Sequence, residues 1–347
     1  MHDLSWVDPH KSSKMTVLYI AGEGRSGSTV LSMILGSYDG IVSIGEFRNV
    51  WQALRTNELC GCSAPVSLCK FWTAVGARAY GGWETIDIDA MINADDKFAR
   101  HRSIPRHIVL RRLLRDTSDL GAYREALGRL YDAIQEISGS RIIVDSTKRA
   151  SYAYVLRDVP GIDLRVVHLV RDSRGVAFSN AKAQIIRPEL EHPASAEPVY
   201  MSAQPLWRTA IDWEVKNLLF YPLVRPSKRR RVKYEDLVAH PSEELSAIVE
   251  FAGADRDEHG SWDAATCSFE SLPHHTLGGN PVRFRRGRVR LEPDDEWKFK
   301  MSRGQKALVS TITFPLLLAY GYPILARRNQ TSGCTHHMRT LARRHKA

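Results

Sequence analysis

Short apolar runs alternate along the chain with stretches in which apolar residues recur at helical spacing. Four such runs predict buried strands: residues 15–21, 41–45, 141–145 and 164–170. Residues 29–36 and 149–157 each follow one of these runs, and their apolar positions recur every three or four residues, as in a helix. Strands and helices that alternate at short spacing form βαβ units, so the pattern predicts an α/β fold with a parallel sheet flanked by helices.

The remaining pattern adds further segments to this predicted sheet. Residues 46–140 have mainly helical periodicity and predict a helical insertion between the second and third strands. Residues 184–205 contain four prolines and no periodicity, which is typical of either a functional lid or a disordered segment. Further elements are expected later in the chain: a strand at 229–234 and helices at 206–221, 242–252 and 302–320.

The composition is that of a folded globular protein. The chain has 347 residues, of which 43% are hydrophobic and 25% charged, so it can bury a sizeable core. Disordered and collagen-like classes are excluded. We expect one domain over residues 15–326, preceded by a polar leader at 1–14 and followed by a basic tail at 327–347.

The net charge of +10 is unevenly distributed. Residues 327–347 carry six basic side chains and no acidic one, so the rest of the chain carries only +4. We interpret the tail as a solvated terminus rather than a nucleic-acid or membrane anchor, because it has little apolar periodicity. A small cationic excess in the body suits a small polyanionic ligand if the charges gather in one cleft.

No targeting or membrane-spanning segment is expected. The first 14 residues are polar, and the apolar stretch that follows them is better explained as a strand than as the core of a signal peptide. The longest other apolar stretch, residues 311–322, is short and contains Pro315. A cytoplasmic, reducing location is therefore expected.

Three of the five cysteines lie close together, at Cys60, Cys62 and Cys69. A metal site is one interpretation, but the spacing fits zinc-binding patterns poorly and no histidine lies nearby in the sequence. The alternative is a local packing turn, with or without a disulfide. We prefer this alternative, and no metal is expected.

Residues 22–29, Gly-Glu-Gly-Arg-Ser-Gly-Ser-Thr, follow the first strand and open the first helix. Gly22 and Gly27 are spaced like the two glycines of a P-loop, whose inward-turned amides and helix N-terminus bind phosphate. Ser28 stands where the lysine of an ATP-hydrolysing loop would be, which counts against triphosphate chemistry. Arg25 provides a cation inside the loop instead. A glycine turn without a ligand is the alternative.

At this point the chain resembles a known family. Residues 24–31 are similar to the 5′-phosphosulfate motif of sulfotransferases that use 3′-phosphoadenosine 5′-phosphosulfate (PAPS). Residues 166–179 resemble the 3′-phosphate motif of the same family, in which an arginine at a strand end and a serine of the next helix hold that phosphate. The resemblance implies a P-loop-like sulfotransferase fold over residues 15–325 and PAPS as the donor. It assigns cofactor binding to the following residues: Gly24, Arg25, Ser26, Gly27, Ser28, Thr29, Arg171 and Ser179.

Two later segments also resemble this family. Residues 232–237 are similar to its Tyr-Glu-Asp-Leu strand end, which we interpret as structural. Residues 283–287, with Trp297 downstream, resemble the basic loop that closes over the cofactor, so Arg285, Arg286 and Gly287 become candidates for the 3′-phosphate. The cysteine cluster and residues 145–148 are similar to features of bacterial members. The lack of a P-loop lysine and of a catalytic histidine favours the branch that acts on carbohydrate, tyrosyl or natural-product hydroxyls.

Three residues are the candidates for catalysis. Glu46 follows the second strand and is expected to act as the general base toward the acceptor hydroxyl. An acid that merely favours a helix N-terminus is the alternative for this residue. Arg25 is expected to stabilise the leaving phosphate oxygen, and Lys148 to share the charge on the sulfuryl group.

Two other functions stay open on the sequence alone. One is an ATP-dependent small-molecule kinase with a degenerate P-loop, in which Asp145 ends a Walker-B-like strand. The other is a non-catalytic anion-binding or nucleic-acid-binding protein. The arginine-rich segment 283–290 has the charge for nucleic acid but only Phe284 as a stacking aromatic, so no nucleic-acid partner is expected. For the acceptor pocket, we expect residues 46–51, the insertion and the 184–205 segment, with Tyr200, Trp207, Trp213, His274 and His275.

Overall fold

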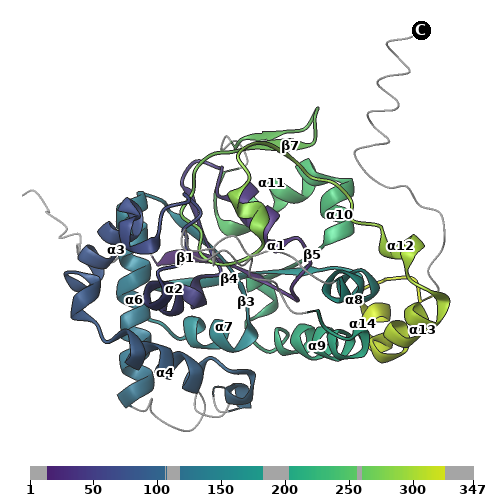
Figure 1. The fold of residues 1–347 in the computed structure, drawn as a ribbon, viewed down its shortest axis with the longest axis horizontal. Helices are drawn as coiled ribbons and strands as arrows, with labels where there is room; N and C mark the ends of the chain where they lie inside the picture. Colours follow the sequence, from purple (N-terminus) through teal and green to yellow (C-terminus); the bar gives the residue numbers. More distant parts are fainter. Residues whose placement is uncertain (1–13, 106, 108–117, 183–202, 256–259, 325–347) are drawn as a thin grey trace, which may run out of the picture.

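A five-stranded parallel sheet forms the centre of the protein (Figure 1). The computed structural model describes residues 14–105, 107, 118–182, 203–255 and 260–324. The strand order is β2-β3-β1-β4-β5. The strands are β1 Met15–Ala21, β2 Ile41–Gly45, β3 Ile142–Lys148, β4 Ile162–Val170 and β5 Arg229–Lys233. The expected α/β fold is therefore confirmed, and β1 lies between β3 and β4.

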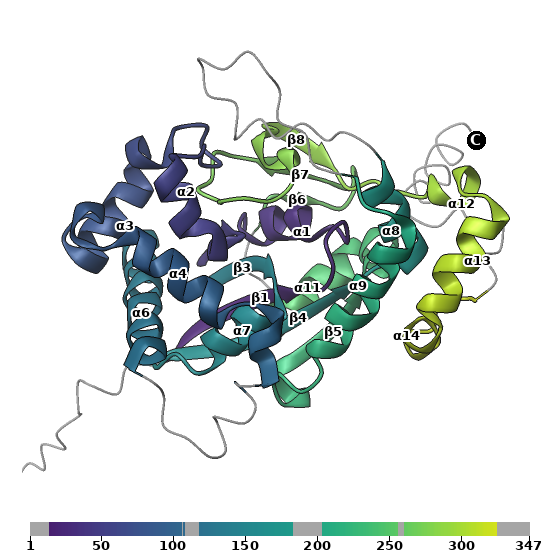
Figure 2. The same cartoon turned by 60° about the horizontal axis from the view of Figure 1, so that its bottom comes forward.

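Both faces of the sheet are buried at its central strand β1, which explains the nearly continuous apolar run there. Val17 and Tyr19 of β1 point into one core and Leu18 and Ile20 into the other, and all four are fully buried. Helices α1 (Ser28–Leu35) and α11 (Pro241–Ala252) cover the second face, and α6 (Ser118–Ser138) and α7 (Ala150–Arg157) cover the first (Figure 2). Burial of each such aliphatic side chain contributes roughly 1.5–3 kcal/mol.

Residues 46–140, for which a helical insertion is expected, form mainly helices where the structure describes them, at one end of the molecule (Figure 2). They contain α2 (Val50–Thr56), α3 (Lys70–Tyr80), α4 (Ile88–Phe98) and α6. The helices at the opposite end of the molecule come from the last part of the chain: α12 Trp297–Lys300, α13 Arg303–Ile312 and α14 Phe314–Ala319. The described residues also form the α-helices α8 Ser173–Ala181, α9 Leu206–Leu219 and α10 Tyr234–Ala239.

The structure corrects the sequence-based expectations at two places. The single helix expected at residues 302–320 is two helices, because Pro315 lies in the first turn of α14 and lacks the N–H that would continue α13. A three-stranded antiparallel sheet was not expected at all. Its strands are β6 Trp262–Asp263, β7 Ser268–Ser271 and β8 Gly287–Arg290. The basic segment expected to be a loop thus becomes partly a strand.

Three expected segments fall outside the described residues or nearly so. The leader at 1–14 is described only at Lys14, and the lid or disordered segment at 184–205 only from residue 203 onward. The basic tail at 327–347 lies wholly outside them. Among the helices that the structure describes, none combines the length and apolar character needed to cross a membrane.

Gly22, directly after β1, lies against the backbone at the end of β4. Its φ is 131°, and a Cβ there would lie 2.2 Å from the carbonyl oxygen of Leu169. Gly24, two residues later, has no heavy atom within 4 Å of the position of its Cβ. We expect Gly22→Ala to lower the free energy of unfolding by about 2 kcal/mol or more, and Gly24→Ala to change it by less than about 0.5 kcal/mol. Urea unfolding followed by circular dichroism measures both; equal losses would contradict this account.

Candidate active site

A cavity of about 900 Å³ lies at the carboxyl edge of the parallel sheet. Ligands of open α/β sheets bind at this edge, where the strand order reverses. Each of the five strands contributes lining residues at or just after its carboxyl end: Gly24 and Arg25 after β1, Glu46 after β2, Lys148 in β3, Arg171 after β4 and Tyr234 after β5. Residues 278–294 supply much of the remaining wall.

The loop between β1 and α1 has the backbone shape of an anion-binding turn. Arg25 has a φ of 66° and Gly27 a φ of 85°, so the chain turns twice through the left-handed region before α1 begins. Gly27 is the N-cap of α1, and no side chain caps this helix end. The first amides of a helix have no partner within it, and Ser28 and Thr29 of this first turn line the cavity. Backbone donors are thus placed at the cavity wall.

Arg171 is held rigidly beside this loop. Its side chain is 4% exposed, and its Nη1 donates to the carbonyl oxygen of Arg25 at 2.8 Å. Its Nη2 donates to the Asp294 carbonyl oxygen at 2.6 Å and lies 3.0 Å from the Asp294 carboxylate. The guanidinium stacks on the ring of Tyr234, with its carbon 4.8 Å from the ring centre. Trp213 is fully buried and donates from Nε1 to the Arg171 carbonyl oxygen at 3.0 Å, so it supports the cavity wall rather than lining it.

Glu46 and Lys148 form an ion pair within the cavity. The Lys148 ammonium donates to Glu46 Oε1, and the two side chains are 14% and 24% exposed, respectively. Lys148 has a φ of 63°, a left-handed conformation that costs a non-glycine residue roughly 1–2 kcal/mol. The Glu46 amide donates to the carbonyl oxygen of Leu277 at 2.7 Å. Although Glu46 stands at the N-cap of a short 3₁₀ helix, its carboxylate makes no capping hydrogen bond there.

The cavity brings together most of the predicted site residues. Its lining includes ten of them: Gly24, Arg25, Gly27, Ser28, Thr29, Glu46, Lys148, Arg171, Ser179 and Arg285. The other three lie outside the lining: Ser26 is buried, Gly287 begins β8, and the Arg286 side chain donates to the backbone carbonyls of Gly61 and Arg283. His274 and His275 pack at the cysteine cluster, Trp207 is exposed and does not line the cavity, and Tyr200 lies outside the described residues.

Sequence reasoning missed several residues of the cavity wall. The clearest is Tyr234, which we interpreted as structural, yet its position directly after β5 matches that of the other strand-end residues. Arg149 and Arg290 also line the cavity. Among the lining residues, six are cationic and four are carboxylates. This excess of positive charge suits an anionic ligand.

Asp145, named in the kinase interpretation, and His168 are both buried in the protein interior. His168 is 1% exposed in the middle of β4, and its Nε2 lies 2.7 Å from Asn217 Oδ1. Asp145 is fully buried and accepts hydrogen bonds from the Thr147 amide at 2.8 Å and the Tyr131 hydroxyl at 2.6 Å. Burial raises the pKa of Asp145 to about 6. Neither residue lines the cavity, so a metal-binding role for Asp145 there has no support.

The fold and the site together define an α/β protein with a glycine-containing loop and a cation-lined cavity at the switch point of a parallel sheet. A family model described as "Sulfotransferase family" matches residues 18–258, which is more than half of the chain. The chain belongs to the sulfotransferase family.

Individual relatives are more distant. Carbohydrate sulfotransferase 1 of Homo sapiens is 25% identical over 184 residues, which cover 49% of this chain and 42% of that protein. Its counterpart in Rattus norvegicus is 26% identical over 176 residues, which cover 47% of this chain and 40% of the relative. The match thus spans about two fifths of the length of these curated relatives.

Two sulfotransferase domains are among the solved structures that match the backbone of this chain. The domain from a Synechococcus olefin synthase is 18% identical with a TM-score of 0.47, and the match covers 92% of this chain and 98% of that one. The domain from the curacin biosynthetic pathway is 16% identical with a TM-score of 0.49, with coverage of 89% and 99%, respectively.

The buried His168 makes the stability of the fold depend on pH. Burial lowers its pKa to about 4, against about 6.5 in the unfolded chain. Its contribution to stability is therefore present above pH 6.5 and is lost as the pH falls toward 4. The free energy of unfolding of the native protein should fall as the pH is lowered from 6.5 to 4.5. We expect this fall to be about 2 kcal/mol smaller in His168→Gln. Urea unfolding at both pH values measures this effect; an unchanged loss would show that His168 titrates normally in the folded protein.

Proposed function

We propose that the protein is a PAPS-dependent sulfotransferase that transfers the sulfuryl group to a hydroxyl of a small-molecule or carbohydrate acceptor. The observation that carries this proposal is one cavity that combines three features: the glycine-rich loop 22–29, called the anion loop below, Arg171 with Ser179, and the Glu46–Lys148 pair. Membership of the sulfotransferase family supports it. The carbohydrate sulfotransferases among the relatives favour a sugar hydroxyl as the acceptor.

The donor set of the cavity fits a nucleotide with phosphates at two positions. The amides of residues 24–29 would hold the 5′-phosphate, and the open space beside Gly24 leaves room for it. Arg171, Ser179 and Arg285 would hold the 3′-phosphate. Because the Asp294 carboxylate already contacts Arg171, a phosphate has to compete with it, and a dianion at this position is the stronger partner.

The proposed reaction is an in-line displacement at sulfur. Glu46 accepts the proton of the acceptor hydroxyl, whose oxygen forms a bond to sulfur as the bond between sulfur and the 5′-phosphate oxygen breaks. Arg25 stabilises the charge that develops on this leaving oxygen, and Lys148 stabilises the sulfuryl oxygens. Lys148 also holds the Glu46 carboxylate in place through their ion pair. The kinase alternative gains no support, because Ser28 replaces the P-loop lysine and Asp145 lies outside the lining.

Calorimetric titration tests donor recognition. Adenosine 3′,5′-bisphosphate should bind the native protein without a metal ion and more tightly than ATP with Mg²⁺. Arg171→Ala should lower the affinity for adenosine 3′,5′-bisphosphate by roughly 10–100-fold. It should lower the affinity for adenosine 5′-monophosphate by less than about 3-fold, because only the bisphosphate carries a 3′-phosphate. Arg288→Ala, an exposed arginine outside the lining, is the matched control. Tighter binding of ATP with Mg²⁺, or equal weakening of both adenosine ligands, would overturn the proposal.

Loss of the proposed base should separate turnover from donor binding. Glu46→Gln is expected to reduce transfer from radiolabelled PAPS to a mixture of mono- and oligosaccharides by about 100-fold or more. Its affinity for adenosine 3′,5′-bisphosphate should stay within about 3-fold of the native value, because Glu46 is not assigned to either phosphate. Glu125→Gln, on the exposed surface of α6, serves as the control. Turnover retained by Glu46→Gln would mean that another group takes the proton.

A further inference from the structure

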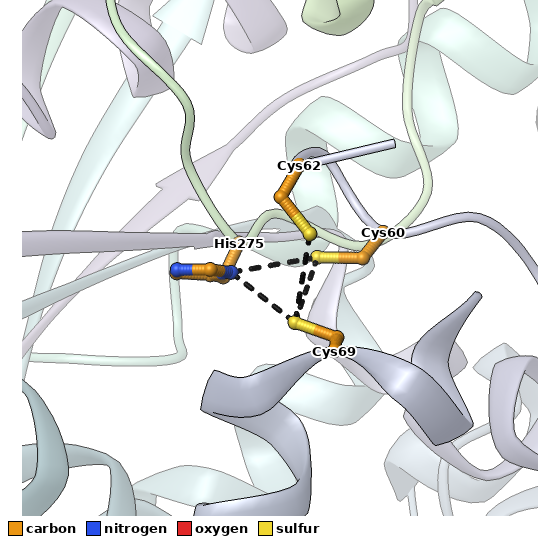
Figure 3. A group of neighbouring side chains, drawn as sticks. All are labelled: Cys60, Cys62, Cys69 and His275. Carbon is orange, nitrogen blue, oxygen red and sulfur yellow. Dashed lines mark hydrogen bonds between the residues drawn. The ribbon is translucent and has the colours of Figure 1, made fainter. Parts of the chain in front are cut away.

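Three cysteines of the insertion meet a histidine from a distant part of the chain beside the start of α3 (Figure 3). The ligand atoms of Cys60, Cys62, Cys69 and His275 all lie within 4.8 Å of one another. In Figure 3 the three sulfur atoms and a ring nitrogen of the histidine point toward a common centre. None of these residues lines the cavity described above.

Four of the six separations between the ligand atoms are close to the edges of a tetrahedron around a metal ion. Cys69 Sγ lies 3.6 Å from both other sulfur atoms and 3.3 Å from His275 Nδ1, and Cys60 Sγ lies 3.8 Å from that nitrogen. In a tetrahedral zinc site with Zn–S bonds of about 2.3 Å and Zn–N bonds of about 2.0 Å, ligand atoms lie roughly 3.5–3.8 Å apart. A disulfide needs sulfur atoms at about 2.05 Å, and all three cysteines are free.

The surroundings hold each ligand in position. A tight turn presents the first two cysteines: the Cys60 amide donates to the Ala64 carbonyl oxygen at 2.8 Å. The ring of His275 stacks on Phe71, with ring centres 4.7 Å apart, and its backbone carbonyl accepts a hydrogen bond from Trp72 Nε1 at 3.0 Å. These contacts hold His275 with its Nδ1 beside the sulfur atoms of Cys60 and Cys69.

We propose that the protein binds one structural zinc ion through four side chains: Cys60, Cys62, Cys69 and His275. Three thiolates and one imidazole in a tetrahedral arrangement select zinc over harder cations. Four protein ligands leave no open position, so the ion is structural rather than catalytic. The histidine that the sequence argument lacked comes from residue 275, more than two hundred residues beyond the cysteines.

The zinc site would link the helical insertion to the wall of the cavity. Directly beside it, the Gly61 amide donates to the Thr276 carbonyl oxygen at 2.9 Å. A Cβ at Gly61 would lie 2.4 Å from His274 Nδ1, so the two segments pack too closely for any larger residue. The next residues contact the cavity, because the Asn280 amide donates to Thr29 Oγ1 at 3.3 Å. The ion thus braces the segment that faces the anion loop.

Metal content and cobalt spectroscopy on the full chain test this proposal. Protein purified without chelators should contain one zinc ion per chain, as measured by inductively coupled plasma mass spectrometry. The metal-free, reduced chain titrated with Co²⁺ should develop a thiolate charge-transfer band and the intense visible bands of tetrahedral cobalt. Cys69→Ser and His275→Ala should each retain less than about a tenth of the zinc, whereas His275→Cys should retain it because a fourth thiolate replaces the imidazole. His240→Ala, which removes an exposed histidine outside the cluster, is the matched control.

The outcomes separate zinc binding from the alternatives. A native chain that binds neither zinc nor Co²⁺ at one equivalent, or that contains a disulfide between two of the three cysteines, overturns the proposal. Equal zinc in Cys69→Ser and the native chain also overturns it. If Cys69→Ser does not fold, the cobalt spectrum of the native chain decides, because it reports the number of thiolate ligands directly. None of these measurements depends on sulfotransferase activity.

Discussion

Parallel pairing of β1 with both β3 and β4 is the constraint on which the site depends. Parallel strands end at the same edge of a sheet, so the residues that follow them converge although they are far apart in sequence. The anion loop, the Glu46–Lys148 pair and Arg171 meet at this edge for that reason alone. A register shift by one residue would turn the alternating buried side chains of β1 to the wrong faces, and both cores therefore fix the position of these catalytic candidates.

Several cationic side chains close together destabilise a fold unless each has an anionic or hydrogen-bonding partner. In the cavity wall these partners are carboxylates and backbone carbonyls, which an anionic ligand can replace. Lys148 is paired with Glu46, and Arg171 with Asp294 and two backbone carbonyls. Such pairing holds the charges in position before a ligand arrives, which is the arrangement that electrostatic catalysis requires. The ring of Tyr234 stacks against the Arg171 guanidinium and stabilises its position without neutralising its charge.

The helical insertion does more than cover one face of the sheet. Its cysteine turn contacts the segment that runs from His275 to Asn280, and this segment forms part of the cavity wall beside Glu46 and Thr29. The buried Arg283 reinforces the same junction by donating to the carbonyl oxygens of Thr276 at 2.7 Å and Leu59 at 2.9 Å. The helical insertion is therefore tied directly to the wall of the cavity.

Local patterns in the sequence determined the parallel sheet, the glycine-containing loop after β1 and the position of Arg171 at the end of β4. Each of these features lies within one contiguous strand, turn and helix. Hydrophobic periodicity and the spacing of glycines therefore predict it. Only the tertiary structure decided which distant side chains meet. In the folded chain Lys148 pairs with Glu46, and Tyr234 stacks against Arg171. His275 joins the three cysteines in the same way. No local pattern predicts these contacts, because each depends on how distant segments pack together. The antiparallel sheet escaped prediction because its strands are only two to four residues long, too short for a period to show.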